Sequence, residues 1–270
     1  MGQAKLRKQR TVAASFGADF GDGGRERLEQ LRVGAYRHAS LSLERARNGE
    51  PAAQLRELTG IHAEAVRALD TATADFLQNS APGPDVAARI ACRQGCNFCC
   101  YTNVEVSIVE AIAVAATIGT NAELRSAVTA AAPVIGGLAP LARIQAKLAC
   151  PLLKDGGCSI YADRPRTCRA FTSYDVRRCE DEFNGPEVER SPVPTFLWPR
   201  AIAQALTSGL QTACGELRLQ SNTVELTSGV ATVLADPQVV PRWLAGESVF
   251  PSSALAPYPS APSVGNTSSK

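Results

Sequence analysis

The chain has 270 residues, and 45% of them are hydrophobic, so it can bury a sizeable core without disulfide bonds. Its formal net charge of +2 gives no reason to expect broad electrostatic binding to nucleic acid or to anionic membranes. It contains no run of about 18 apolar residues and no N-terminal pattern of a signal peptide, so we expect a cytoplasmic protein without a transmembrane helix.

Residues 1–25 are first basic and then glycine-rich, and we expect them to be disordered. No Gly-Lys-Ser/Thr follows the glycines, so a flexible linker is a better interpretation than a phosphate-binding loop.

Two amphipathic segments follow, at 26–48 and 52–79, and predict an antiparallel helical hairpin over residues 26–80. In the second segment apolar residues recur every three or four positions, as on one face of an α-helix. The sequences GEP at 49–51 and APGP at 81–84 end the two helices.

A cysteine-rich metal-binding core is expected over residues 85–185. Within it, the apolar stretch at 104–119 predicts a buried helix that ends at Gly119. Asn121 can cap a further helix at 122–132.

The later part of this core carries shorter elements. A short helix at 140–149 leads to Cys150, and residues 150–161 predict a small β-hairpin with Asp155-Gly156-Gly157 at its turn. We expect Asp163 to cap a short helix that contains Cys168.

Beyond a proline-rich connector, amphipathic segments at 200–219 and 223–234 predict two helices in a region, 195–248, that packs on the core. Trp243 is expected to pack back on the body, and the Pro/Ser/Ala-rich residues 251–270 to be disordered. The alanine-rich, aromatic-poor composition favours a mainly α fold: an irregular helical domain with a cysteine-rich metal-binding centre and at most a small β-hairpin.

Eight of the nine cysteines lie between residues 92 and 179, and four of them lie in the string CRQGCNFCC. In a reduced compartment, clustered thiols are more often metal ligands than structural disulfides, with a redox-switch disulfide network as the alternative. Thiolate sulfur is the preferred ligand of zinc and of the iron in iron–sulfur clusters. We therefore expect the metal ligands to be Cys92, Cys96, Cys99, Cys100, Cys150, Cys158, Cys168 and Cys179, called here the cysteine cluster.

The spacing of these residues leaves the number of centres open. Adjacent side chains usually diverge, so Cys99 and Cys100 are expected to serve two metals or one bridged cluster. A regular hairpin would hold Cys150 and Cys158 roughly 10 Å or more apart, so either the turn is an irregular knuckle or the two serve different centres. Gly95 is expected to supply a positive φ in the first loop.

One further cysteine and the two histidines could also bind metal, but we expect them to have packing roles. Cys214 stands alone in a predicted helix, where an ordinary buried cysteine is expected. His38 and His62 lie in the N-terminal helices, where packing is the better interpretation than ligation. The expected ligand set is therefore sulfur alone.

Arginines surround the later cysteines, and a solvated basic face is the simplest interpretation of them. We expect Arg164 and Arg169 to do more, because they flank Cys168 and could offset the negative charge of a thiolate centre.

CRQGCNFCC followed by CPLLKDGGCSIYADRPRTCR resembles the YkgJ-type cysteine-cluster family, described as zinc- or iron-chelating proteins. The chain matches the family pattern at Cys92, Cys96, Cys99, Cys100, Cys150, Pro151, Leu153, Cys158, Ile160, Tyr161, Arg164, Pro165, Cys168 and Arg169. The resemblance implies zinc, iron or an iron–sulfur cluster as cofactor, with Tyr161, Arg164 and Arg169 beside it. The family is distantly similar to flagellin lysine N-methylases, which implies S-adenosylmethionine as a further cofactor.

The C-x3-C-x-aromatic-C spacing from Cys92 to Cys99 is also similar to that of radical S-adenosylmethionine enzymes. The chain lacks the alternating strands and helices of their barrel, so that fold is not expected. The spacing still favours a [4Fe–4S] cluster with an open iron site.

The first hypothesis is therefore a metal- or iron–sulfur-cluster-binding protein of unassigned cellular role. The alternatives are an iron–sulfur-dependent protein lysine N-methyltransferase and a zinc-stabilised structural or interaction module. A protein partner or protein substrate stays open.

Overall fold

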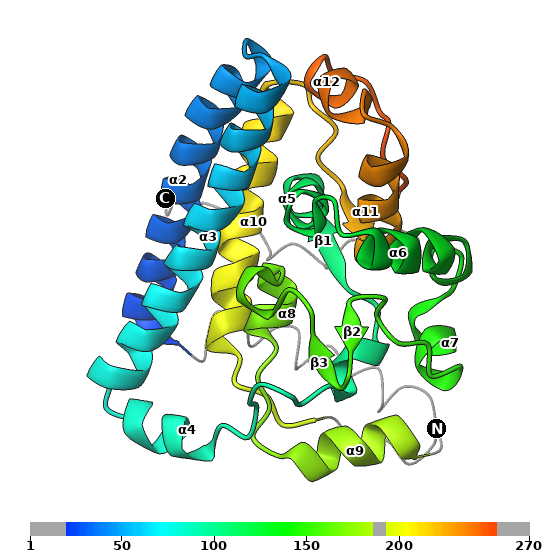
Figure 1. Cartoon of the computed structure of the whole chain (residues 1–270). Coiled ribbons are helices and arrows are strands. Elements are labelled where there is room, and N and C mark those ends of the chain that lie inside the picture. The colour runs from blue at the N-terminus through cyan, green and yellow to red at the C-terminus, as the bar shows by residue number, and fades with distance from the viewer. Residues whose placement is uncertain (1–19, 186–192, 253–270) are drawn as a thin grey trace, which may run out of the picture.

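The computed structural model describes residues 20–185 and 193–252, and helices dominate both ranges (Figure 1). The predicted mainly α fold is confirmed. The disorder predicted for residues 1–19 and 253–270 falls outside the described residues. None of the described helices combines the length and the apolar character needed to cross a membrane.

Long helices form one side of the molecule: α2 (Gly21–Arg47), α3 (Pro51–Asn79) and α10 (Trp198–Glu216). They lie side by side in Figure 1, with α2 and α3 paired as the predicted hairpin. Helix α10 approaches α2 so closely at Gly209 that an added Cβ would collide with the carbonyl oxygen of Arg32. Only glycine permits this approach of the two backbones.

Helix α2 begins at Gly21, so the predicted disorder is wrong for residues 21–25. The Phe20 ring packs on Trp198 of α10 with a centroid distance of 4.8 Å, and the contact holds the start of the helix against the bundle. The glycine-rich composition of these residues predicts a linker, but the contact between Phe20 and Trp198 holds them in a helix.

Helix α5 (Ile108–Ile118) is buried along nearly its whole length, as the apolar run predicts, and it packs between α3 and α11. It begins later than expected because residues before it form strand β1 (Glu105–Ser107), which pairs antiparallel with β4 (Thr223–Glu225). It ends at Gly119, whose φ is +53°. The strand β4 likewise shortens the helix predicted at 223–234.

The remaining helices of the core include α11, which packs on α5, and α6, which packs on α11. Helix α6 starts after Asn121, whose side chain accepts the predicted capping hydrogen bond from the backbone of Leu124 at 3.1 Å. Trp243 is fully buried, as expected. These elements are α6 (Ala122–Ile135), α7 (Pro140–Gln145), α11 (Leu226–Ala235) and α12 (Val239–Leu244).

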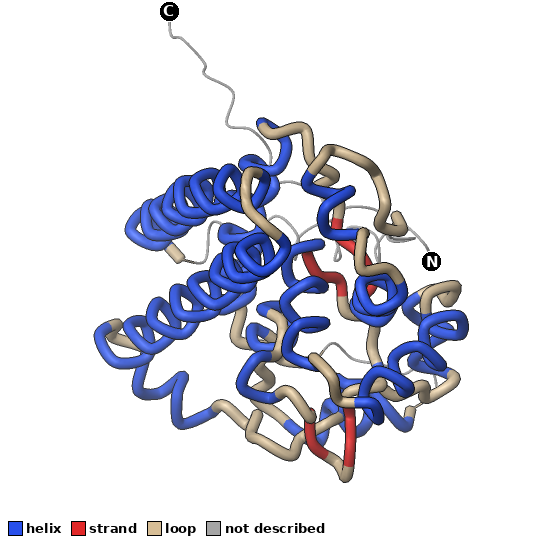
Figure 2. The backbone as a smooth tube through the Cα atoms, turned by 45° about the horizontal axis from the view of Figure 1, so that its top comes forward, coloured by secondary structure: helices blue, strands red, loops and turns tan. Residues whose placement is uncertain are grey.

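Shorter elements carry the cysteines or adjoin them. They are α4 (Gly83–Arg89), η1 (Phe98–Tyr101), β2 (Leu153–Lys154), β3 (Gly157–Cys158), η2 (Tyr161–Asp163), α8 (Arg166–Ala170) and α9 (Val176–Asn184). The predicted hairpin is the β2–β3 pair, with Asp155 and Gly156 in the turn at positive φ. In Figure 2 it lies apart from the β1–β4 pair, a second small sheet that the sequence analysis did not predict.

A buried ion pair joins α8 to α5. Arg166 Nη2 donates to Glu110 Oε2 at 2.9 Å, the Arg166 backbone N–H donates to Glu110 Oε1 at 2.9 Å, and both side chains are 2% exposed. The same carboxylate accepts from the N–H and hydroxyl of Ser107 and completes a capping box on α5. The prediction that Asp163 caps the short helix is therefore wrong, because Glu110 satisfies the first N–H of α8 from across the fold.

The surroundings of Glu110 keep it ionised. Burial by itself would raise its pKa, but the Arg166 charge and the donated hydrogen bonds hold the pKa below the usual 4.5.

A second buried pair holds the segment that leads into the cysteine hairpin. Arg143 Nη1 donates to Glu225 Oε1 at 3.0 Å, and Arg143 Nε donates to the carbonyl of Leu148 at 3.3 Å. Each of the two pairs thus connects a cysteine-bearing segment to the strand-and-helix units of the core.

We expect Glu110→Gln to lower the free energy of unfolding by about 3–5 kcal/mol, because it leaves Arg166 buried without a counter-charge. Urea denaturation checks this. Glu123→Gln is the matched control, since its pair with Lys154 is exposed and should contribute no more than about 1 kcal/mol. Equal losses in the two variants would contradict the role of the buried pair.

His62 is 6% exposed, and neither of its ring nitrogens has a hydrogen-bond partner. Burial lowers its pKa below 6.5, against a smaller opposite effect of the Glu110 charge. The unfolded chain therefore binds more protons near and below pH 6.5, and this residue makes stability fall as the pH drops.

Relative to His62→Leu, the native chain should lose up to about 1.4 kcal/mol of stability for each pH unit below about pH 6. Urea denaturation of both proteins from pH 5 to pH 8 measures the difference. Parallel curves over this range would show that His62 does not titrate on unfolding.

Candidate metal centre

The fold brings the cysteine-bearing segments together in the lower part of Figure 1, around α8, α9 and the β2–β3 hairpin. The backbone N–H of Cys150 donates to the carbonyl of Cys100 at 2.7 Å and joins the first cysteine loop to the hairpin. The Phe183 ring of α9 lies 4.7 Å from the Tyr101 ring, centroid to centroid, and this contact holds α9 against η1. Helix α9 thereby brings Cys179 close to the first cysteine loop.

All nine cysteines are free, and each member of the cysteine cluster is half-buried. One set gathers around Cys92. Burial raises the pKa of Cys92 and of Cys179, and in both cases the nearby thiols of Cys96 and Cys99 raise it further. Cys92, Cys96, Cys99 and Cys179 therefore lie within electrostatic reach of one another.

A second set gathers around Cys168. Burial raises the pKa of Cys168 well above its usual value, and Cys150, Cys99 and Cys158 add to the shift. Burial also raises the pKa of Cys150 to about 11. Without a cation these thiols keep their protons at neutral pH, so a bound metal ion would supply the charge that thiolate formation needs here.

Cys99 belongs to the surroundings of both sets, and it shares a proton with its neighbour. A hydrogen bond with Cys100 lowers the pKa of Cys99 to about 7 and raises the pKa of Cys100 far above the usual value. One thiolate and one thiol at this dipeptide is the expected state near neutral pH. Cys100 also lies within electrostatic reach of Cys150 and Cys168.

Backbone N–H groups point at several sulfur atoms. Ser173 N–H donates to Cys92 Sγ at 3.1 Å, and the backbones of Leu152 and Ile160 donate to Cys150 and Cys158 and lower the pKa of each against burial. Donors of this kind favour the thiolate, the form that ligates metal, and orient it.

The hairpin is shorter than the sequence predicts. Its ladder has only the pairs Leu153–Cys158 and Lys154–Gly157, and the chain turns just before it, where Leu153 N–H donates to the carbonyl of Cys150 at 2.9 Å. Cys150 therefore lies outside the ladder, so the separation expected from a regular hairpin does not apply to it. Cys158 lies within electrostatic reach of Cys150. Gly95 has the expected positive φ, +89°.

The Arg164 charge acts on several of the thiols. Burial raises the pKa of Cys158 and Cys168, and the Arg164 charge acts against it at both. The guanidinium also lies over the Tyr161 ring, 4.1 Å from its centroid, so Tyr161 positions the arginine.

The structure directs the other arginines elsewhere. Arg169 pairs with Asp70 of α3 at 3.0 Å and donates to the carbonyl of Ala162. Arg166 is the buried partner of Glu110, so a solvated basic face is the wrong interpretation for this arginine. Arg177 is exposed.

Cys214 and His62 pack in the protein interior, as predicted. Cys214 is 3% exposed in α10, and burial raises its pKa to about 12 with no contribution from another thiol. His62 is buried in α3, next to residues of the main core.

Sequence reasoning missed Ser173. Its N–H binds Cys92, its side chain hydrogen-bonds Cys179, and it is 1% exposed. Its contact with both cysteines depends on the loop after α8 folding back onto residues 91 and 92, where the Ala91 N–H donates to the Ser173 carbonyl. No local pattern marks such a residue.

The donor set fits a thiophilic metal, because every member is a sulfur and several receive N–H hydrogen bonds. Within the described ranges, no three His, Cys, Asp or Glu side chains are yet closed around one point that could hold an ion. Metal binding at this place would therefore require the thiols to lose protons and to move closer together.

Residues 91–189 match the model of the CxxCxxCC family, whose description is "Putative zinc- or iron-chelating domain". The match confirms the resemblance seen in the sequence, and it covers just over a third of the chain. The match supports the binding of a metal ion by the cysteine-rich part. Searches of curated proteins and of solved structures each gave no significant match.

We expect Arg164→Gln to weaken metal binding by about tenfold, since it removes the positive charge that faces the thiolates. Competition with a chromophoric chelator measures the affinity. Arg177→Gln, at an exposed position on α9, is the control and should bind as the native chain does. Equal affinity of the two variants would show that Arg164 does not compensate the charge of the centre.

Proposed function

We propose that this chain is a metal-binding protein whose cysteine cluster holds zinc, iron or an iron–sulfur cluster through sulfur alone. The observation that carries the proposal is the set of backbone N–H groups directed at Cys92, Cys150 and Cys158 in the region that carries the eight clustered cysteines. N–H donors of this kind stabilise thiolates, and thiolates are the ligands that these metals prefer.

Two centres account for the distribution of the thiols. One would take Cys92, Cys96, Cys99 and Cys179, and the other would take Cys100, Cys150, Cys158 and Cys168. Each set supplies the four sulfurs that a zinc ion or a [4Fe–4S] cluster requires. Arg164 and the Cys99–Cys100 dipeptide lie where the sets meet, which supports a division between adjacent residues.

The chemistry depends on the metal. Zinc would close each site and contribute to folding, whereas an iron–sulfur cluster would supply electron transfer or, with an open iron, a place for a small ligand. The methyltransferase alternative has no observation of its own in the described residues. Metal binding in the cytoplasm, without an assigned reaction, is the function we propose.

Metal analysis of protein prepared without oxygen tests the proposal. A brown sample with iron and acid-labile sulfide would establish the cluster, and a colourless sample with two zinc ions per chain would establish the structural alternative. An apo protein whose stability does not respond to chelators, zinc or iron would refute metal binding.

Variants separate the two centres. Cys179→Ser should remove about half of the metal, and Cys168→Ser should remove the other half and destabilise the fold, because metal-binding energy is also folding energy. Cys99→Ser, at the junction, should impair both. Cys214→Ser should change neither metal content nor stability by a measurable amount.

Metal-to-protein ratios and thermal unfolding of these variants provide the measurements. Complete loss of metal from both Cys179→Ser and Cys168→Ser would instead show a single centre. Loss of metal from Cys214→Ser to the same extent would overturn the ligand assignment.

A further inference from the structure

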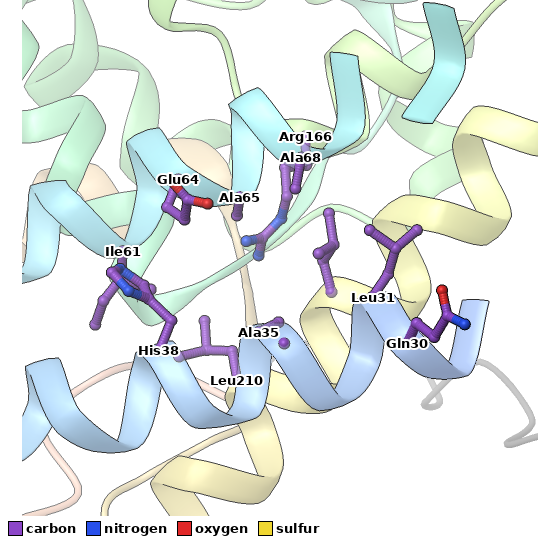
Figure 3. A pocket seen from close by; sticks show the side chains of 12 residues that line it. Gln30, Leu31, Ala35, His38, Ile61, Glu64, Ala65, Ala68, Arg166 and Leu210 are labelled. Carbon is purple, nitrogen blue, oxygen red and sulfur yellow. The ribbon is translucent and has the colours of Figure 1, made fainter. Parts of the chain in front are cut away.

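A cavity of about 220 Å³ lies among the long helices, and Arg166 of α8 also lines it (Figure 3). Its wall is mostly apolar and comes from α2, α3 and α10. No cysteine lies on the described wall, so the cavity is separate from the metal centre. The apolar lining residues are Leu31, Ala35, Ile61, Ala65, Ala68, Leu206 and Leu210.

Two polar groups in this wall lack hydrogen-bond partners. Arg166 is 2% exposed, and its Nε has no partner even though its Nη2 binds Glu110, Ser107 and Thr207. The Nε2 atom of His38 is also buried without a hydrogen-bond partner. Figure 3 shows Arg166 extending into the space between the helices and His38 reaching in from α2. A guanidinium N–H can only donate, so an acceptor must come from an occupant.

A glycine keeps the cavity open at α2. Gly34 lies near the middle of this helix and lines the cavity, and a Cβ added there would meet nothing within 4 Å. Glycine in a helix interior is less favourable than alanine, because it loses more backbone freedom on folding. Neither backbone conformation nor close packing requires glycine at this position.

The charges around the cavity are already balanced. Glu110 compensates Arg166, and Arg67 pairs with Glu64 of the wall at 2.6 Å. A charged occupant would be buried without a counter-charge, which is costly. A neutral occupant with one acceptor oxygen would satisfy the free N–H at no such cost.

We infer that this cavity is a binding site for a small, uncharged, mostly apolar molecule that presents one hydrogen-bond acceptor to Arg166. A cavity of 150 Å³ takes benzene, so about 220 Å³ accommodates about nine non-hydrogen atoms. The inference goes beyond the proposed metal-binding function and does not depend on it.

Three molecules with the same number of non-hydrogen atoms and a common aromatic body serve as probes: acetophenone, isopropylbenzene and benzoate. Acetophenone offers a neutral acceptor, isopropylbenzene offers none, and benzoate carries a charge. Titration of the full chain, followed by ligand-observed NMR, should show acetophenone binding with about millimolar affinity or better. Isopropylbenzene should bind at least about tenfold more weakly, because it leaves the Arg166 N–H unsatisfied, and benzoate should also bind more weakly.

The site is tested by Gly34→Leu, which places a side chain at the cavity wall without a steric clash and should weaken acetophenone binding by at least about tenfold. Gly60→Leu is the matched control, since Gly60 lies in α3, also has open space at its Cβ, and does not line the cavity. Ala68→Leu blocks the cavity from α3 and should have the same effect as Gly34→Leu, so a folding defect in one variant does not decide the result.

Circular dichroism verifies that each variant is folded. Absence of binding by all three probes, or equal acetophenone binding by the native chain and both blocking variants, would overturn the site. Equal affinity for isopropylbenzene and acetophenone would overturn the role of Arg166, and a preference for benzoate would overturn the choice of an uncharged ligand. None of these outcomes depends on metal content.

Discussion

The ion pair between Glu110 and Arg166 is the interaction on which the rest of the arrangement depends. It lies inside the protein, where an unpaired charge would be strongly unfavourable, so the start of α8 can occupy only a place that presents Arg166 to the carboxylate. Cys168 follows two residues later on the same short helix, and Arg164 precedes it. The position of one buried carboxylate on α5 therefore determines where the central part of the cysteine cluster lies.

The pair of Arg143 and Glu225 acts in the same way at the approach to Cys150. Glu225 ends strand β4, and Glu110 lies in the first turn of α5, which directly follows strand β1. Both anchors therefore adjoin the same small sheet. The thiols themselves contribute little to holding this region together without a metal, since they are half-buried and form no disulfide bonds. The helical core supplies the frame, and the metal would supply the closure of the sites.

Much of the local structure could be predicted from the sequence. The stripe along α3, the apolar run of α5, the Asn121 cap and the turn at Asp155 and Gly156 are all set by neighbours within a few residues, and the structure has each of them. The errors occurred where a distant partner intervened. Trp198 orders the start of α2 through Phe20, β4 converts the first residues of the expected buried helix into a strand, and Glu110 replaces Asp163 as the cap of α8.

The sequence by itself determined the chemistry of the protein: clustered thiols, few histidines and a specific cysteine motif indicate sulfur ligation of a soft metal, because ligand type depends on the residues alone. Only the tertiary structure decided that Arg164 acts on several of those thiols and that Ser173 contacts two of them. It also decided that a cavity exists behind α8. These features depend on contacts between residues far apart in the chain, and such contacts form only where burial and charge pairing bring whole helices together.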